Sequence, residues 1–154
     1  MHHARAHALS FACAAALAAG ACAAASAPAP ASAPLRPDHP LIGAWQFTIP
    51  NGACSETYRI DRGGTTLVTS ADEVAETRFT LSDQPSAKGY YKWVDTLVKD
   101  NGKKDCGGQV TKPGKTTTNF IKMINEAGTA FVMCGAEDGK QCIGPFVKLQ
   151  GGEI

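Results

Sequence analysis

Turn signals recur along residues 41–154 at intervals too short for long helices. Each contains glycine or proline beside a residue that favours a chain reversal. The segments between them are rich in Thr, Val, Ile, Tyr and Phe, which favour β-strands. The pattern predicts consecutive antiparallel strands and an all-β domain. The signals are Asn51-Gly52, Gly63-Gly64, Ser82-Asp83 with Pro85, Asn101-Gly102, Pro113-Gly114, Ala127-Gly128 and Asp138-Gly139.

Eight strand-like runs follow from these turns. In the first run, Trp45 and Phe47 alternate with Gln46 and Thr48, which gives one buried and one wet face. Eight strands can close a small up-and-down antiparallel barrel, and closure removes exposed sheet edges. We therefore predict an eight-stranded barrel. The runs are 42–49, 54–61, 65–71, 74–82, 89–99, 107–111 continuing at 115–124, 129–135 and 143–150.

Residues 1–22 have the composition of an export signal. Arg5 precedes an apolar run that is too short for a membrane span, and small residues follow it. The tetrapeptide Ala19-Gly20-Ala21-Cys22 resembles a lipobox, which makes Cys22 a candidate for lipidation and for a membrane tether. Cleavage near residues 23–25, which would leave a soluble protein, is the alternative.

Residues 23–40 consist mainly of Ala, Ser and Pro, a composition that buries no core and is typical of a linker. The expected organisation is an export signal, this linker and a barrel domain over residues 41–154. It predicts a protein of the periplasm or, as a lipoprotein, of the outer membrane. Secretion into the medium is the less favoured destination.

The predicted domain contains four cysteines, and an even number in an exported chain indicates two disulfides. Three pairings are compatible with four cysteines. We expect Cys54–Cys106 and Cys134–Cys142, because the second pair flanks the hairpin signal Asp138-Gly139. Zinc binding is disfavoured because no Cys-x-x-Cys spacing is present, and no other metal site is predicted.

The first strand carries a short motif, Gly43-Ala44-Trp45, after an irregular leader and before seven further strands. This arrangement resembles the opening of lipocalin-like (calycin) proteins. The resemblance implies that Gly43 allows close chain approach at the closed end and that Trp45 plugs the barrel bottom. It also implies a basic partner above the tryptophan from a late strand, for which Lys148 is the candidate.

Aromatic residues suggest where a ligand would lie. Tyr91 and Trp93 share one face of their predicted strand with Asp95, and Tyr58 lies on the inward face of the second run. Such side chains fill a core or line a ligand site, where they supply apolar area and a polar tip. Tyr58, Tyr91 and Trp93 are therefore the candidate ligand-binding residues.

Catalysis is not predicted. All four histidines precede residue 41, which leaves no imidazole for a Ser-His-Asp or Cys-His mechanism in the predicted domain. No glycine-rich phosphate loop or cofactor motif is present. The carboxylates on or beside predicted strands are interpreted as solvated strand faces; they are Glu56, Asp72, Glu73, Glu76 and Asp95.

The net charge of the chain restricts the kind of partner that we expect. Arg5 is the only charged residue before position 23, so Lys plus Arg falls from 15 to 14 and equals the 14 Asp plus Glu. A neutral chain argues against nucleic acid, which needs a basic face. The favoured function is binding of a small, partly apolar ligand by an exported lipocalin-like barrel. The alternative is a protein-binding module, such as a periplasmic inhibitor or immunity-type protein, acting through loops 100–106 or 135–142.

Overall fold

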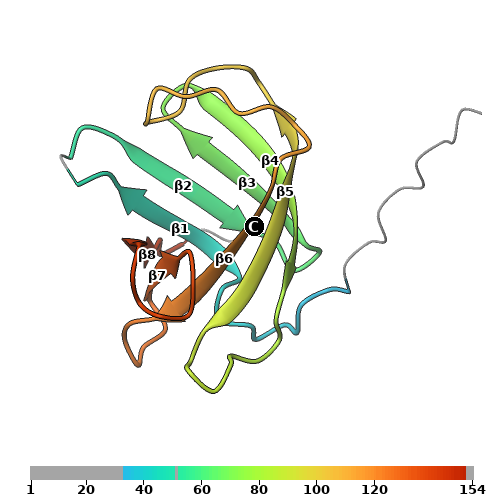
Figure 1. Ribbon diagram of the computed structural model, residues 1–154, viewed down its shortest axis with the longest axis vertical. Helices are drawn as coiled ribbons and strands as arrows, with labels where there is room; N and C mark the ends of the chain where they lie inside the picture. Colours follow the sequence, from blue (N-terminus) through green and yellow to red (C-terminus); the bar gives the residue numbers. More distant parts are fainter. Residues whose placement is uncertain (1–32, 51, 152–154) are drawn as a thin grey trace, which may run out of the picture.

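Eight strands joined in chain order close into one antiparallel barrel in the computed structural model, which describes residues 33–50 and 52–151 (Figure 1). The last strand pairs with the first and so completes the closure. Within these ranges no helix is long and apolar enough to cross a membrane. The predicted fold class is confirmed. The strands are β1 (Gly43–Thr48), β2 (Ser55–Ile60), β3 (Thr65–Ser70), β4 (Glu73–Leu81), β5 (Tyr91–Asp100), β6 (Thr116–Met123), β7 (Ala130–Cys134) and β8 (Cys142–Lys148).

Side-chain alternation places the core as the sequence predicts. On β4, Ala75, Thr77 and Phe79 are buried while Val74 and Arg78 are exposed. The same inward face continues on β5 through Tyr91, Trp93 and Leu97. Period-two alternation on every wall is what a barrel with a filled interior requires.

One predicted strand segment is wrong. Residues 107–111 belong to a long β5–β6 loop, residues 101–115, which arches over one end of the barrel (Figure 1). The carboxylate of Asp105 accepts a hydrogen bond from the Gln109 amide at 2.7 Å, and its carbonyl accepts one from the Gly108 amide at 2.9 Å. This local turn provides hydrogen-bond partners for backbone amides that would otherwise pair with a neighbouring strand.

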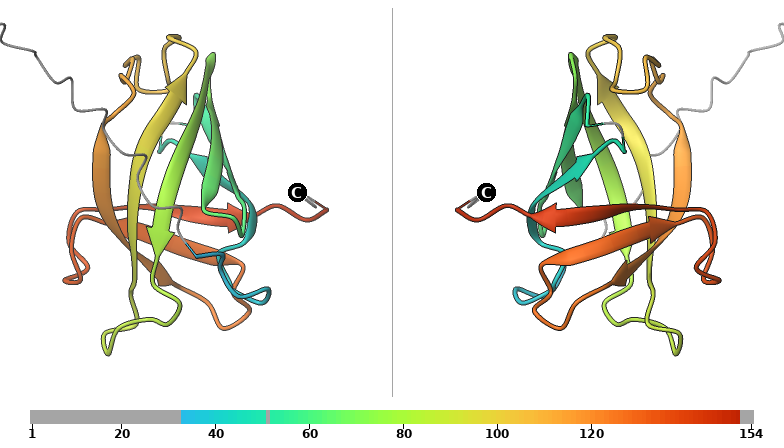
Figure 2. Two further views of the ribbon diagram at one scale, coloured as in Figure 1. Left: turned by 90° about the vertical axis from the view of Figure 1, so that its right-hand side faces the viewer. Right: turned by 90° about the vertical axis from the view of Figure 1, so that its left-hand side faces the viewer.

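Both predicted disulfides are confirmed. Cys54–Cys106 joins the β1–β2 turn to the β5–β6 loop across the loop-covered end of the barrel. Cys134–Cys142 closes the β7–β8 hairpin. Because β7 and β8 run obliquely across the barrel, this hairpin projects from its side (Figure 2).

The opposite end of the barrel is closed by the three residues of the predicted plug. Trp45 is 0% exposed, and its Nε1 donates a hydrogen bond to the Leu41 carbonyl at 2.9 Å. The Lys148 ammonium lies 5.2 Å from the centre of the Trp45 ring. Gly43 has φ +126°, and a Cβ there would approach Lys148 Cε to 3.2 Å, so the backbone conformation and the close approach both favour glycine.

The folded part begins before the expected boundary at residue 40. Leu35 joins the core cluster, and its amide donates to the Arg62 carbonyl at 2.9 Å. His39, expected in the linker, is buried at the closed end beside Tyr91. Composition alone missed these anchors because single apolar residues are hidden among Ala, Ser and Pro. The predicted signal, Cys22 and the first part of the linker, residues 23–32, lie outside the described residues.

Stacked aromatic rings fill the half of the interior next to the plug. Phe131 and Phe146 stack with centroids 4.6 Å apart, and Phe47 stacks on Phe146 at 5.0 Å. Trp45 meets Phe131 edge to face at 4.7 Å. The packed half forms the floor for the half beneath the β5–β6 loop, which holds a cavity.

Candidate functional site

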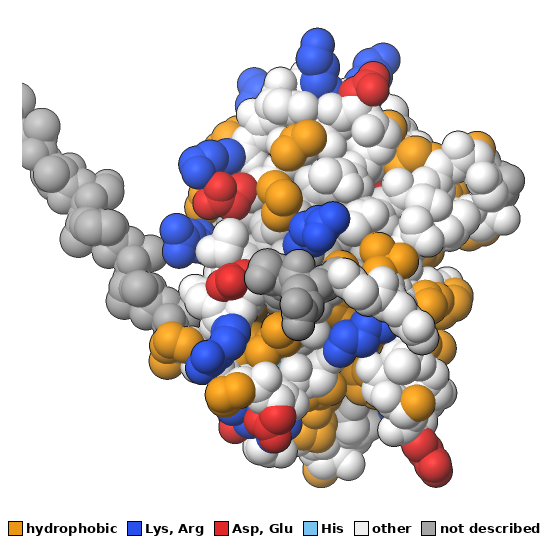
Figure 3. Space-filling model, turned by 180° about the vertical axis from the view of Figure 1, so that it is seen from behind, with side chains coloured by type: hydrophobic (Ala, Val, Ile, Leu, Met, Phe, Trp, Pro, Cys, Tyr) orange, Lys and Arg blue, Asp and Glu red, His pale blue; other side chains and the backbone are white. Residues whose placement is uncertain are grey.

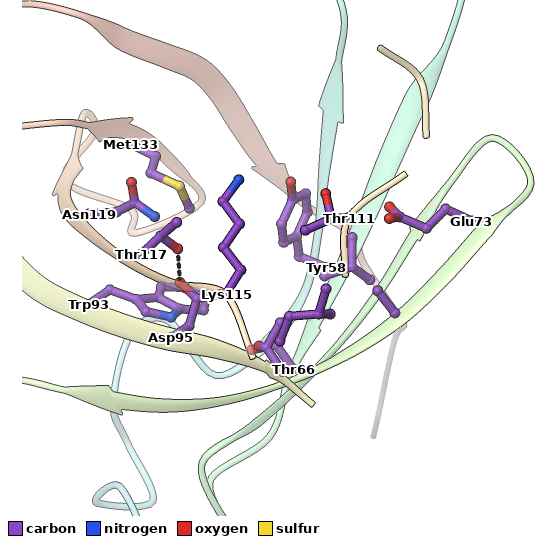
Figure 4. A pocket seen from close by; sticks show the side chains of 14 residues that line it. Tyr58, Thr66, Glu73, Trp93, Asp95, Thr111, Lys115, Thr117, Asn119 and Met133 are labelled. Atoms are coloured by element: carbon purple, nitrogen blue, oxygen red, sulfur yellow. Dashed lines mark hydrogen bonds between the residues drawn. The ribbon is translucent and has the colours of Figure 1, made fainter. Parts of the chain in front are cut away.

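The cavity in the loop-covered half of the barrel has a volume of about 240 Å³. Its walls come from β2 to β7, and the β5–β6 loop contributes Thr111 and Lys115 at the mouth (Figure 4). Apolar side chains alternate with polar ones around it. This volume lies just below the usual range of small-molecule sites, which is about 300 to 1,000 Å³.

Two of the three predicted ligand-binding aromatics line this cavity. Trp93 and Tyr58 form part of its wall. Tyr91 shares the inward face with Trp93 but lies in the packed half, where its ring centre is 5.2 Å from that of His39. Strand alternation predicts which face a residue occupies but not its depth along the barrel axis, so it does not distinguish Tyr91 from the residues that line the cavity.

Three buried polar atoms on the cavity wall have no hydrogen-bond partner within the described part of the chain. They are the hydroxyls of Thr66 and Thr77 and the indole Nε1 of Trp93. The three residues are 1%, 8% and 3% exposed. A buried unsatisfied polar group costs roughly 1 to 3 kcal/mol, so such groups in a native protein are explained by water, strain or a ligand.

Asp95 brings a carboxylate into the cavity wall, which corrects its interpretation as a solvated strand residue. Thr117 on the neighbouring strand donates a hydrogen bond to Asp95 Oδ1 at 2.8 Å (Figure 4). Burial raises the pKa of Asp95, while this hydrogen bond opposes the rise. The side chain therefore presents an acceptor in a partly desolvated site.

Glu73 places a second carboxyl group on the wall, nearer the mouth, and its interpretation as a solvated residue is also corrected. Burial, a hydrogen bond with Asp100 and the charges of Asp100, Asp105 and Glu56 raise the pKa of Glu73 to about 7. Like charges close together disfavour the ionised form, as does desolvation. Glu73 thus titrates near neutral pH.

This pKa predicts a pH-dependent stability. The folded chain holds the Glu73 proton more tightly than the unfolded chain does. Protonation of Glu73 therefore stabilises the fold, and this stabilisation is fully present below pH 4.5 and is lost as pH rises through about 7. The Glu73→Gln variant does not show that loss. At alkaline pH its free energy of unfolding should therefore exceed that of the wild type by about 1 kcal/mol, allowing for solvent screening. Urea denaturation across the pH range measures it.

Glu76→Gln is the matched control for that experiment. Glu76 lies on the same strand but on the outer face, where Lys99 pairs with it at 2.7 Å and lowers its pKa. This variant should keep the wild-type fall in stability between acid and neutral pH. Equal pH profiles for Glu73→Gln and the wild type would contradict the assignment.

A hydrogen-bonded chain holds the mouth together. Glu56 accepts hydrogen bonds from the Tyr58 hydroxyl at 2.7 Å and from the Ser70 hydroxyl at 2.6 Å. The Ser70 oxygen in turn accepts one from the Cys106 amide at 2.9 Å. Burial, followed by the charge of Glu56, raises the pKa of Tyr58 well above its usual value. The network and the Cys54–Cys106 disulfide anchor the β5–β6 loop over the cavity.

The outer surface mixes both signs of charge, and basic side chains gather at the end where the β5–β6 loop lies (Figure 3). Lys103, Lys104 and Lys112 of that loop are exposed. Among residues 33–50 and 52–151, no three His, Cys, Asp or Glu side chains come together in a group that could hold a metal ion.

His39 belongs to the folded part, yet backbone groups occupy both of its ring nitrogens. Nε2 lies 3.3 Å from the Ser82 carbonyl oxygen, and Nδ1 accepts a hydrogen bond from the Leu41 amide at 3.4 Å. Burial lowers its pKa. These contacts indicate that His39 has a structural role at the closed end. It is not among the residues that line the cavity.

Most of the polar lining lies outside the set of sites predicted from the sequence. Thr66, Thr77, Thr117, Asn119 and Lys115 were not among the candidates, and Asp95 and Glu73 were assigned to solvated faces. One signal was available for Asp95, because alternation put this carboxylate on the same face as Trp93 and Leu97.

No protein family, curated protein or solved structure matches this chain.

Proposed function

We propose that this protein is an exported barrel of the bacterial envelope that binds a small, partly apolar molecule in its loop-covered half. The observation that carries the proposal is the cavity of about 240 Å³ whose wall holds three buried polar atoms without partners. Thr66, Thr77 and Trp93 would exchange unsatisfied atoms for hydrogen bonds to a ligand, while Trp93 and Leu97 offer apolar area.

Two features of the sequence support the cellular setting. The composition of residues 1–22 is that of an export signal, and a lipidated Cys22 would tether the domain to a membrane through the Ala/Ser/Pro-rich segment. Two disulfides fit an oxidising compartment. The plug formed by Gly43, Trp45 and Lys148 supports the lipocalin-like interpretation, in which one end of the barrel stays closed.

Binding in this cavity requires no catalytic step. The four domain cysteines are paired in disulfides, and His39 contacts backbone groups through both nitrogens. The remaining polar lining offers hydrogen bonds and charge, which position a ligand without requiring chemistry on it.

Native mass spectrometry of the protein purified from its own envelope tests this function. We expect a small non-covalent adduct that disappears on denaturation. Trp93→Ala should lose the adduct, because it removes both the indole donor and the wall area. Tyr90→Ala is the control, since Tyr90 lies outside the cavity wall under Lys122. Adduct-free wild-type protein would contradict the proposal.

A protein-binding function is the second candidate, and the Cys134–Cys142 hairpin is the observation that favours it. The hairpin projects from the barrel side (Figure 2). Near its tip, the Glu137 carbonyl accepts a hydrogen bond from Lys88 Nζ at 3.4 Å. A rigid exposed loop suits an inhibitor or immunity-type protein. Replacing both hairpin cysteines by serine should then abolish capture of an envelope protein, whereas cavity binding should survive the change.

A further inference from the structure

The charge balance of the cavity indicates a ligand class. Asp95 and Glu73 place two carboxyl groups on the wall, and Lys115 is the only cation among the described lining residues. Lys115 is exposed, and its ammonium group points away from Asp95 (Figure 4). Within the described ranges no ion pair joins Lys115 to either carboxyl group. Lys115 acts on Asp95 only through a longer-range attraction that opposes the rise that burial causes in the Asp95 pKa, so Asp95 is the inner charge of the cavity and forms no ion pair among the described residues.

The hydrogen bonds of Asp95 leave room for a ligand. Its side chain accepts from Thr117 Oγ1 at 2.8 Å and from its own backbone amide. An ionised carboxylate offers about four lone-pair sites on its two oxygens, so acceptor capacity remains. A partly buried carboxylate without an ion-paired cation is costly, and a cation brought by the ligand offsets that cost.

The neighbours of Asp95 suit the rest of such a ligand. Trp93 and Leu97 lie two residues to either side on the same inward face of β5 and give an apolar wall. Aromatic faces attract cations within about 6 Å of the ring centre. The unpartnered atoms of Thr66, Thr77 and Trp93 are free to bond one further polar group.

We propose that the cavity binds a small organic cation, with a primary ammonium group against Asp95 and an apolar body against Trp93 and Leu97. This inference rests on the proposed ligand-binding function and narrows it. A neutral molecule would leave Asp95 without an ion-paired cation, and an anionic molecule would face Asp95 and Glu73 together. Charge complementarity therefore discriminates among ligands of equal size and shape.

Isothermal titration calorimetry with three probes that share a phenyl ring and differ in charge tests the proposal. They are phenethylamine, phenethyl alcohol and hydrocinnamate, titrated at neutral pH into the protein with both disulfides formed. We expect phenethylamine to bind at least about tenfold more tightly than either of the others, a difference of about 1.4 kcal/mol.

Asp95→Asn removes the charge and keeps the shape of the side chain and an oxygen for Thr117. Phenethylamine affinity should fall about tenfold in this variant while phenethyl alcohol affinity stays unchanged. Glu76→Gln is the control, because Glu76 pairs with Lys99 on the outer face of β4. It should leave all three affinities unchanged. Thermal unfolding checks that each variant is folded. If Asp95→Asn does not fold, the comparison of the three probes on the wild-type protein still tests the proposal.

The outcomes separate this inference from the function on which it rests. Equal or tighter binding of the alcohol or the carboxylate overturns the cation preference, and the ligand-binding function stands. Failure of all three probes overturns the cation inference as well. If native mass spectrometry then finds a retained neutral or acidic molecule, only the cation inference falls, whereas adduct-free protein removes the function too.

Discussion

Replacing Trp45 by alanine is expected to lower the free energy of unfolding by about 3 to 5 kcal/mol. Trp45 is fully buried, and its removal leaves Phe131 without the ring that it meets at 4.7 Å. It also leaves the Leu41 carbonyl without the indole donor at 2.9 Å. Because a domain of this size has a total stability of about 5 to 15 kcal/mol, the variant should be close to unfolding.

Urea denaturation followed by circular dichroism measures this loss. Trp45→Phe is the informative partner variant, because it keeps a ring in the plug and removes the indole donor. It should recover a large part of the stability, and the remaining deficit reports on the Leu41 hydrogen bond and the Lys148 contact. A change under about 0.5 kcal/mol in Trp45→Ala, the scale of an ordinary surface substitution, would contradict the plug.

Replacing Cys54 and Cys106 by serine is expected to cost about 4 kcal/mol, the chain-entropy value for a disulfide that closes a loop of this length. The cysteines are 52 residues apart in sequence. The structure adds a local effect, because this disulfide and the Ser70–Cys106 hydrogen bond anchor the β5–β6 loop over the cavity. The loop should gain mobility, which hydrogen exchange at residues 101–115 measures.

The hairpin disulfide is the matched control for that experiment. Cys134 and Cys142 are only 8 residues apart, so their double serine variant should lose about 2.6 kcal/mol and leave exchange in residues 101–115 unchanged. Unaltered exchange in the Cys54→Ser/Cys106→Ser variant would show that the disulfide does not restrain the loop. Equal stability losses in the two variants would contradict the loop-length argument.

Local patterns carried most of the fold prediction. Turn dipeptides and period-two alternation depend on neighbouring residues alone, so they identify strands such as β4 without knowledge of the partners. The Cys134–Cys142 pairing follows similarly from the Asp138-Gly139 turn between the two cysteines. The segment 107–111 failed because Asp105 forms a competing turn, a feature that a strand-propensity pattern does not weigh.

The closed end was predictable in part. Gly43 and Trp45 lie two residues apart in a recognisable motif, and the lipocalin-like resemblance implied Lys148 as the candidate basic partner, whose ammonium lies 5.2 Å from the Trp45 ring centre. Leu35 and His39 were not, because their burial depends on the distant partners Arg62, Ser82 and Tyr91. The composition of a segment reports whether it can form a core by itself, and it does not report whether another part of the molecule covers it.

The sequence by itself determined the strand number and most strand faces, because each depends on a local period or a turn, and the hairpin turn between Cys134 and Cys142 favoured the observed disulfide pairing. Only the tertiary structure decided which inward residues lie deep in the aromatic core and which surround the cavity. Tyr91 and Trp93 show the difference, since they share one strand face and one core cluster, yet only Trp93 lines the cavity. Position along the barrel axis follows from strand register and tilt, which arise when all eight strands close together.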